Sequence, residues 1–128
     1  MKHIQKVRVT YADTDHAGAV YYANYLKWLE IGRTEILRQH GLTYAEFEKQ
    51  GIVAPVVHAE IDFKEAPKYD DIVEIHTTLE AIGNSSITFS YEIKAGDKVF
   101  AIAKTVNVFT KDKKKVSVPE EIRKLLQK

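Results

Sequence analysis

Two carboxylates and a glycine lie in one short turn, at Asp13, Asp15 and Gly18, just before a tyrosine-rich stretch. The spacing of the apolar residues after this turn predicts that a helix begins near Tyr22. The free N–H groups of a helix's first turn, and its positive dipole end, favour a negative charge nearby. One aspartate is therefore explained as a cap or as part of the turn. The second leaves room for chemistry at the helix end.

Several other kinds of site are excluded because their patterns are missing. The six glycines are too scattered for a phosphate-binding loop or a dinucleotide fingerprint, and no G-x-S-x-G occurs. The five histidines never stand four residues apart, which excludes a helical zinc pair. The Asp-x-Asp pair lacks the glutamate that a calcium loop needs. The absence of cysteine excludes disulfides and thiolate sites and fits a cytosolic protein. We therefore predict no metal site.

The composition is that of a folded protein whose 128 residues fit one domain, residues 1–128. A hydrophobic fraction of 45% with 29% charged residues argues against disorder. The net charge of +1 gives no reason to expect a nucleic-acid partner, and the lysine run at residues 111–115 is interpreted as a solvated hairpin turn. No apolar stretch approaches the ~20 residues of a membrane span, and no signal peptide is recognised.

The elements that must position the turn can be predicted from periodicity. Residues 2–11 alternate between apolar and polar types, which predicts a strand with one wet face. From Tyr21 the period changes to three and four, which predicts a helix of about 18 residues that ends at Gly41. Gly32 lies within its apolar stripe, where glycine costs roughly 1 kcal/mol relative to alanine. A close approach of this helix to a sheet would compensate for that cost.

The rest of the chain is mostly strand-like. Thr43 and Glu46 have the spacing of a capping box, which predicts a short second helix. Alternating segments predict four further strands, at residues 52–66, 71–81, 85–95 and 99–110. Pro119 opens a terminal helix. This order predicts an α+β fold in which one antiparallel sheet carries a central helix across one face.

The stretch YADTDHAGAVYYANYLKWLEIGRTEILRQHG resembles a motif of the 4-hydroxybenzoyl-CoA thioesterase branch of the hotdog-fold acyl-CoA thioesterases. That motif runs aromatic-x-D-x-D-x-x-G-x-V-Y/F-Y/H-x-x-Y before a long helix. GIVAPVVHAEIDFKEAPKYDDIVEI and NSSITFSYEI resemble later strands of the same family, so the resemblance extends over residues 4–110. It implies the hotdog fold, an antiparallel sheet wrapped around one long central helix.

The resemblance implies an acyl-CoA thioesterase that hydrolyses a short-chain, long-chain or aromatic acyl thioester to a free acid and a thiol. Asp15 matches the family's catalytic carboxylate, which acts as general base or as nucleophile. Tyr22 matches the position whose backbone N–H stabilises the developing oxyanion. Gly18 would let the turn approach the acyl group, and Asp13 is assigned to turn geometry. No cofactor is implied, because coenzyme A is part of the substrate.

Four further residues are candidates for substrate binding, and two of them, Tyr25 and His58, also have a purely structural interpretation. Tyr25 would line an acyl pocket, or would belong to the core because of its helical spacing. His58 would reach the acyl pocket of a partner subunit, or would be a buried, hydrogen-bonded strand histidine. Ser85 and Ser86 would bond the pantetheine or a phosphate, at a place where some relatives carry arginines and lysines that are missing here.

The resemblance also implies assembly, because hotdog relatives pair their sheets edge to edge and build active sites between subunits. A homodimer or a homotetramer is therefore expected. Two rival functions stay open: a dehydratase of hydroxyacyl thioesters, which would need a histidine base, and a non-enzymatic protein that binds or scaffolds acyl thioesters. The acyl group, and the choice between coenzyme A and acyl carrier protein, are not decided by the sequence.

Overall fold

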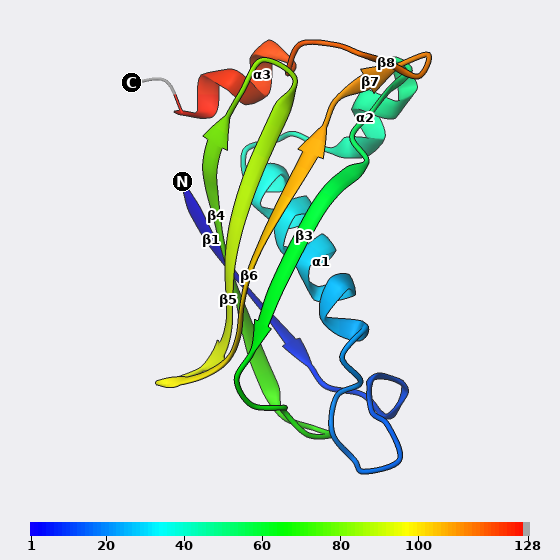
Figure 1. The fold of residues 1–128 in the computed structure, drawn as a ribbon. Helices are drawn as coiled ribbons and strands as arrows, with labels where there is room; N and C mark the ends of the chain where they lie inside the picture. The colour runs from blue at the N-terminus through cyan, green and yellow to red at the C-terminus, as the bar shows by residue number, and fades with distance from the viewer. Residues whose placement is uncertain (127–128) are drawn as a thin grey trace.

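The computed structural model describes residues 1–126 and packs one long helix against one sheet (Figure 1). The sheet has five antiparallel strands in the order β1-β4-β5-β6-β3. These strands are β1 (Lys2–Arg8), β3 (Val56–Phe63), β4 (Ile72–Ile82), β5 (Ser86–Ala95) and β6 (Lys98–Val108). The α+β arrangement predicted from periodicity is therefore confirmed.

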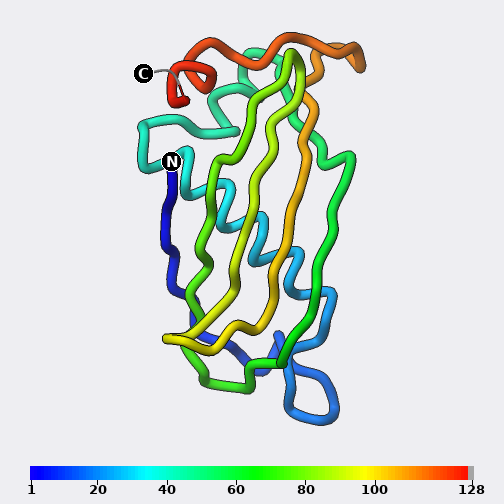
Figure 2. Tube along the Cα trace, turned by 60° about the vertical axis from the view of Figure 1, so that its left-hand side comes forward, coloured from blue at the N-terminus to red at the C-terminus, as the bar shows by residue number. Residues whose placement is uncertain are grey.

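The central helix, α1 (Asn24–Arg38), crosses one face of the sheet diagonally (Figure 2). It has 15 residues, fewer than the predicted length of about 18, and it begins two residues after the predicted start at Tyr22. The N–H groups of Asn24 and Tyr25 bond to the carbonyls three residues back, so the chain enters the helix through a tighter turn. The predicted end is confirmed by Gly41, whose φ of +77° suits a glycine cap.

Gly32 lets α1 lie close to the sheet. A Cβ atom at this position would overlap the side chains of Thr77 and Ile75 on β4, so the predicted close approach is confirmed. The core between helix and sheet consists of interlocking large side chains. Its fully buried members include Trp28, Leu29, Ile36, Ile75, Phe89 and Ile93.

Shorter elements cover the ends of the sheet. Thr43 is the N-cap of α2, because its hydroxyl accepts a hydrogen bond of 3.2 Å from the Glu46 N–H. The second half of the predicted capping box is not formed, since the Glu46 carboxylate accepts from Lys49 Nζ at 3.0 Å. The short elements are α2 (Tyr44–Lys49), β2 (Ile52–Val53), β7 (Thr110–Lys111), β8 (Lys114–Lys115) and α3 (Glu120–Arg123), with 3₁₀ turns at Tyr11–Asp13 and Lys124–Leu126. The strand predicted at residues 52–66 is two strands, because Pro55 between them has no amide donor.

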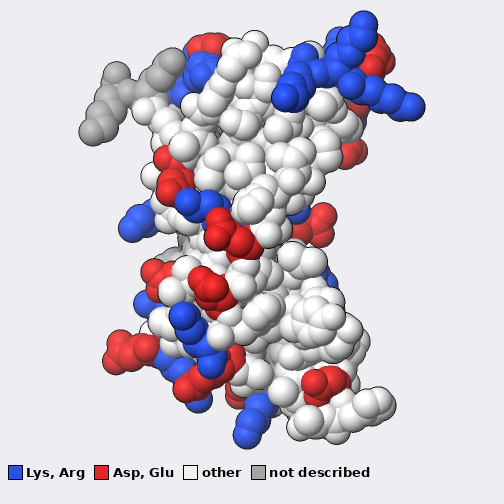
Figure 3. All heavy atoms as spheres, viewed as in Figure 1, with Lys and Arg blue, Asp and Glu red and all other residues white. Residues whose placement is uncertain are grey.

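The lysine run forms the turn between β7 and β8, as predicted, with positive φ at Asp112 and Lys113. Figure 3 shows basic side chains gathered at this corner, while acidic and basic side chains are interspersed over the rest of that face. Within residues 1–126, no helix is both long and apolar enough to cross a membrane. The same residues contain no group of three or more histidine or acidic side chains placed to hold a metal ion.

Candidate active site

Asp13 is buried and holds the turn before α1 together. Its carboxylate accepts hydrogen bonds from the N–H and the hydroxyl of Thr10, at 2.9 and 3.0 Å. Its carbonyl accepts from the Tyr21 N–H at 2.8 Å and from the Asn24 side-chain amide at 2.9 Å, which ties the turn to the start of α1. The Nζ of Lys27 lies 3.8 Å from the same carboxylate. The predicted role of Asp13 in turn geometry is confirmed.

Asp15 lies two residues further along and is exposed. Its Oδ1 accepts a hydrogen bond of 2.8 Å from the Ala17 N–H, while Oδ2 accepts none from residues 1–126. The Gly18 N–H donates to the Asp15 carbonyl at 3.1 Å, with φ of +80° at Gly18. That left-handed conformation costs a residue with a side chain roughly 1–2 kcal/mol. The turn therefore presents one Asp15 oxygen to the outside, and its backbone conformation favours glycine at position 18.

Tyr22 and Ala23 supply two backbone N–H groups at the start of α1. Neither group donates a hydrogen bond to any other part of the chain that the structure describes. Both precede the first helical residue, Asn24, at the positive end of the helix dipole. These N–H groups are therefore available to a negatively charged oxygen.

Two hollows lie on either side of the neighbouring rings of Tyr21 and Tyr22, whose centroids are 4.7 Å apart. The first contains Asp15 and is lined by Tyr11, Ala12, Thr14, Asp15, His16, Tyr21 and Asn24. The second lies between α1 and β3, has a volume of about 340 Å³ and is here called the apolar groove. Its lining residues are Tyr22, Ala23, Leu26, Ala59, Ile61 and Phe63. An open carboxylate, free N–H donors and an apolar groove thus lie together at one end of the molecule.

Tyr25 lies beneath the apolar groove and belongs to the core, with only 2% of its surface exposed. Its ring packs edge-on against Phe63 and Trp28, with centroid distances of 4.9 and 5.3 Å. Burial raises the pKa of the Tyr25 hydroxyl, which lies 3.4 Å from the Glu65 carbonyl. In this position Tyr25 supports the wall of the groove by holding the Phe63 ring.

His58 is exposed, so its interpretation as a buried strand histidine is wrong. Its side chain is 57% exposed, and its Nε2 lies 3.4 Å from Glu60 Oε1. The reason is alternation along β3: His58 lies on the same face as Glu60, opposite the residues Ala59 and Ile61 that face α1. Contact of His58 with a partner subunit stays a prediction.

Ser85 and Ser86 lie at the β4–β5 connection, at the opposite end of the sheet from the Asp15 turn (Figures 1 and 2). The 11 residues of β4 span about 36 Å at 3.3 Å per residue. The Ser85 carbonyl accepts a hydrogen bond of 2.8 Å from the Phe109 N–H, which fixes this end of the hairpin. A single chain therefore does not bring the two serines to Asp15.

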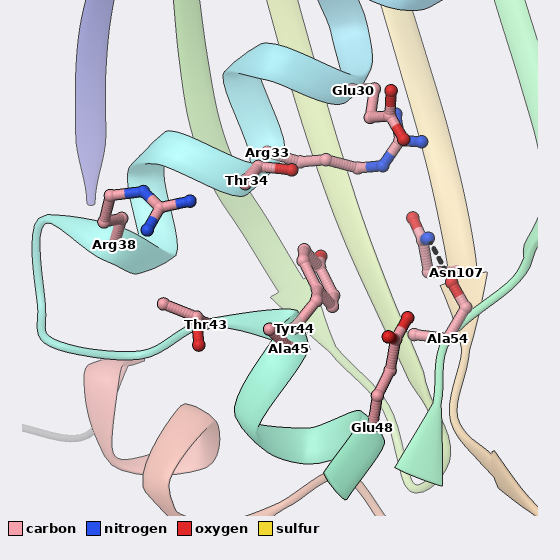
Figure 4. Close-up of a pocket in the computed structure, with 10 residues that line it drawn as sticks. All are labelled: Glu30, Arg33, Thr34, Arg38, Thr43, Tyr44, Ala45, Glu48, Ala54 and Asn107. Carbon is pink, nitrogen blue, oxygen red and sulfur yellow. Dashed lines mark hydrogen bonds between the residues drawn. The ribbon is translucent and has the colours of Figure 1, made fainter.

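A cavity of about 430 Å³ lies at the other end of α1 and was not predicted from the sequence (Figure 4). It lies between α1, α2 and the strands, and Arg33, Tyr44 and Asn107 are among its lining residues. The helical spacing sets Arg33 off the apolar stripe, and Tyr44 lies inside the capping-box sequence, so neither is conspicuous. The one indication in the sequence is Asn107, a polar residue in phase with Ala101 and Ala103 on β6. All three side chains are buried.

The chain matches the thioesterase-like superfamily over residues 9–126. The acyl-CoA thioesterase YbgC of Haemophilus influenzae is 34% identical over 121 residues, which cover 91% of this chain and 88% of that protein. The crystal structure of a hypothetical protein from Aquifex aeolicus has a TM-score of 0.92 at 33% identity, covering 98% of this chain and 99% of that one. A 1,4-dihydroxy-2-naphthoyl-CoA thioesterase from Synechocystis has a TM-score of 0.90 at 25% identity, covering 96% and 93%. The chain therefore belongs to the thioesterase-like superfamily and is a thioester hydrolase with the hotdog fold, as the resemblance of its turn-and-helix motif predicts.

Proposed function

We propose that this protein is an acyl-CoA thioesterase whose active site is formed by the Asp15 turn and the start of α1. The observation that carries the proposal is the combination of the exposed Asp15 carboxylate with the N–H groups of Tyr22 and Ala23, which donate no hydrogen bond within residues 1–126. The name of the YbgC relative supports coenzyme A as the thiol part of the substrate. Acyl carrier protein is the alternative carrier.

In the proposed reaction the thioester carbonyl oxygen accepts a hydrogen bond from the Tyr22 N–H and gains negative charge as a nucleophile adds. Acting as general base, Asp15 takes a proton from water while the water oxygen bonds to the carbonyl carbon. Acting as nucleophile, a carboxylate oxygen of Asp15 forms a mixed anhydride, which water then hydrolyses. In both routes the C–S bond breaks, and the sulfur leaves as a thiolate that takes up a proton. The products are an acid and a thiol, and no cofactor is required.

The apolar groove is the proposed acyl site. It starts at Tyr22, beside the oxyanion donor, and its walls carry apolar side chains from both α1 and β3. Tyr22 and Phe63 are 63% and 50% exposed, so the groove is open along one side in a single chain. An acyl chain bound there would remove this surface from water, which favours binding.

We also propose that two copies pair along the free edge of β3 and form a homodimer. Around a two-fold axis the two β3 strands would run antiparallel, so the start of one would lie beside the end of the other. The β4–β5 connection of the second copy, with its Ser85 and Ser86, would then lie toward the Asp15 end of the first. Pairing would also carry His58 to the subunit interface.

The proposal is tested by measuring thiol release from short-chain, long-chain and aromatic acyl-CoAs and from an acyl–acyl carrier protein. The Asp15→Asn variant keeps the shape of the turn, since an amide oxygen can still accept from the Ala17 N–H. We expect wild type to turn over at least one substrate, and Asp15→Asn to lose roughly 10²–10⁴-fold in kcat.

Asp97→Asn is the matched control, because Asp97 is exposed in the β5–β6 turn and lines neither the Asp15 hollow nor the apolar groove. It should keep wild-type turnover. If Asp15→Asn hydrolyses as fast as the control, the assigned mechanism is wrong. If wild type binds acyl thioesters and releases thiol from none, the rival binding or scaffolding function replaces the enzymatic one.

A further inference from the structure

The cavity at the far end of α1, here called the polar cavity, contains buried polar atoms without partners. Asn107 is 2% exposed, and its Nδ2 donates a hydrogen bond of 2.7 Å to the Ala54 carbonyl. That bond fixes the orientation of the amide, so Oδ1 is the acceptor left without a partner among residues 1–126. The Tyr44 hydroxyl is likewise buried and has no partner there. Because buried polar groups are normally hydrogen-bonded, these two atoms are available to a ligand that enters the cavity.

The three side chains that converge on this space come from three elements. Figure 4 shows Arg33 from α1, Tyr44 from α2 and Asn107 from β6 around one opening. Burial raises the pKa of Tyr44, so its hydroxyl keeps its proton and can donate. The Arg33 guanidinium is a second donor, and Asn107 Oδ1 is an acceptor.

A hydroxyl group matches this set of atoms, because it both donates and accepts a hydrogen bond. It could donate to Asn107 Oδ1 while accepting from Tyr44. A carboxylate has no proton for Asn107 Oδ1, so it would leave that buried acceptor without a partner. The charges of the wall do not discriminate, because Arg33 and Arg38 line it together with Glu30 and Glu48. The cavity therefore favours a neutral hydroxyl over a negatively charged end group.

The apolar groove and the polar cavity follow one another along α1, and they share no lining residue. Leu26 lines the groove and Glu30, one helical turn later, lines the cavity. On the sheet, Ala59 of the groove pairs with Thr105, two residues before Asn107. Eleven residues separate Tyr22 from Arg33 in the sequence, which is about 16 Å at 1.5 Å per residue. An extended acyl chain of about 12 carbons covers this distance, since each C–C bond of about 1.5 Å advances the zigzag by slightly less.

We infer that the groove and the cavity form one acyl site, and that its preferred substrate is a thioester of a medium-length acyl chain carrying a hydroxyl at the end remote from the thioester. The acyl chain lies in the groove, and its distal hydroxyl binds Tyr44 and Asn107. The thioester part of this inference rests on the proposed function. The recognition of a distal hydroxyl rests on the polar cavity alone.

The test compares binding of dodecanoate, 12-hydroxydodecanoate and dodecanedioate to the full chain by calorimetry, together with thiol release from the first two as coenzyme A thioesters. We expect 12-hydroxydodecanoate to bind roughly three- to tenfold more tightly than dodecanoate, as one gained hydrogen bond would give. The ratio of kcat/KM values should show the same preference. Tyr44→Phe should abolish it in both assays, and this variant should fold because the lost hydroxyl has no partner among residues 1–126.

Tyr69→Phe is the matched control, since it removes a tyrosine hydroxyl that lines neither the polar cavity nor the apolar groove. This variant should keep the preference for the hydroxylated chain. Equal binding of dodecanoate and 12-hydroxydodecanoate, or tightest binding of dodecanedioate, would overturn the inference. Thiol release without a preference for the hydroxylated chain would support the proposed thioesterase function and contradict the hydroxyl site. A hydroxyl preference in binding without thiol release would contradict the proposed function and leave the polar cavity as a hydroxyl site.

Discussion

Asp13 and Asp15 are two residues apart, and their carboxylates have opposite surroundings. Asp13 is buried and satisfied by Thr10, so its charge is used to hold the turn. Asp15 is exposed and has an oxygen without a partner among residues 1–126. Substituting Asp13 would disturb the backbone that positions the site. Substituting Asp15 changes mainly what the site can do, which makes Asp15→Asn a test of chemistry more than of folding.

The Glu74–His76 pair gives a prediction about pH. His76 Nε2 lies 2.9 Å from Glu74 Oε1, and this hydrogen bond lowers the pKa of Glu74 below its ordinary value of 4.5. A lowered carboxyl pKa means that folding favours the ionised form. The stability contributed by Glu74 is therefore complete above pH 4.5 and is lost as the pH falls through the lowered pKa. We expect Glu74→Gln to unfold more easily than wild type at pH 6, with the difference disappearing toward pH 3.

Urea unfolding of both proteins across this pH range measures the effect. Glu121→Gln is the control, because Glu121 is an exposed carboxylate on α3 that forms no ion pair within residues 1–126. Its stability should follow that of wild type at every pH. A constant gap between Glu74→Gln and wild type from pH 6 to pH 3 would contradict the linkage.

The role of a single residue could be predicted where it depends on its neighbours in the sequence. The separate roles of Asp13 and Asp15 follow from the motif, and hydrogen bonds confirm that of Asp13. The exposure of His58 follows from alternation, because His58 shares the polar face of its strand with Glu60 and Asp62, and its interpretation as a buried histidine did not use this pattern. The polar cavity was missed because Tyr44 and Asn107, which are 63 residues apart in the sequence, meet only when α2 packs beside β6.

At the scale of elements, the contact between α1 and β4 depends on Gly32. A methyl group at this position would overlap the side chains of Thr77 and Ile75, which are both buried. We expect Gly32→Ala to lower the free energy of unfolding by about 1–2 kcal/mol. Overpacking of about 1–3 kcal/mol outweighs a gain in helix propensity of about 1 kcal/mol or less. Denaturant unfolding measures the difference.

Gly83→Ala is the matched control for this prediction. A Cβ at Gly83 would meet mainly the hydroxyl end of the Ser86 side chain, which can rotate away. Its cost should be clearly smaller than that of Gly32→Ala. If Gly32→Ala were as stable as wild type, the helix would not be held at the distance that the structure indicates.

The elements themselves were largely predictable, because each has its own periodicity and its own end markers. Gly41 and the Thr43 N-cap end α1 and begin α2 as predicted. The start of α1 was not predicted correctly. The tyrosines before it have helical spacing, but the Tyr21 N–H and the Asn24 side-chain amide donate to the Asp13 carbonyl, which holds this segment in a tighter turn. Local spacing does not contain such tertiary hydrogen bonds.

At the scale of the whole molecule, the strand order β1-β4-β5-β6-β3 decides which surfaces are left open. No local pattern predicts this order, because it depends on which strands meet after folding. It places β3 at an edge, next to the apolar groove, and it separates Ser85 and Ser86 from Asp15 by the length of the sheet. A free edge strand beside exposed apolar side chains is an aggregation hazard unless another chain covers it.

The proposed dimer predicts that a charge on β3 dissociates the protein. Ala59 is exposed on this edge and lines the apolar groove, so Ala59→Lys leaves the fold of one chain intact. In a two-fold dimer the added lysine and its copy would both lie at the joint, where they repel each other and lose water. We expect wild type to sediment as a dimer or a tetramer and Ala59→Lys to shift toward the monomer. Ile4→Lys places the same charge on β1, at the opposite edge of the sheet, where Ile4 is 52% exposed. If Ile4→Lys dissociates the protein and Ala59→Lys does not, the chains pair through β1, and the groove must then be closed by something other than a second β3.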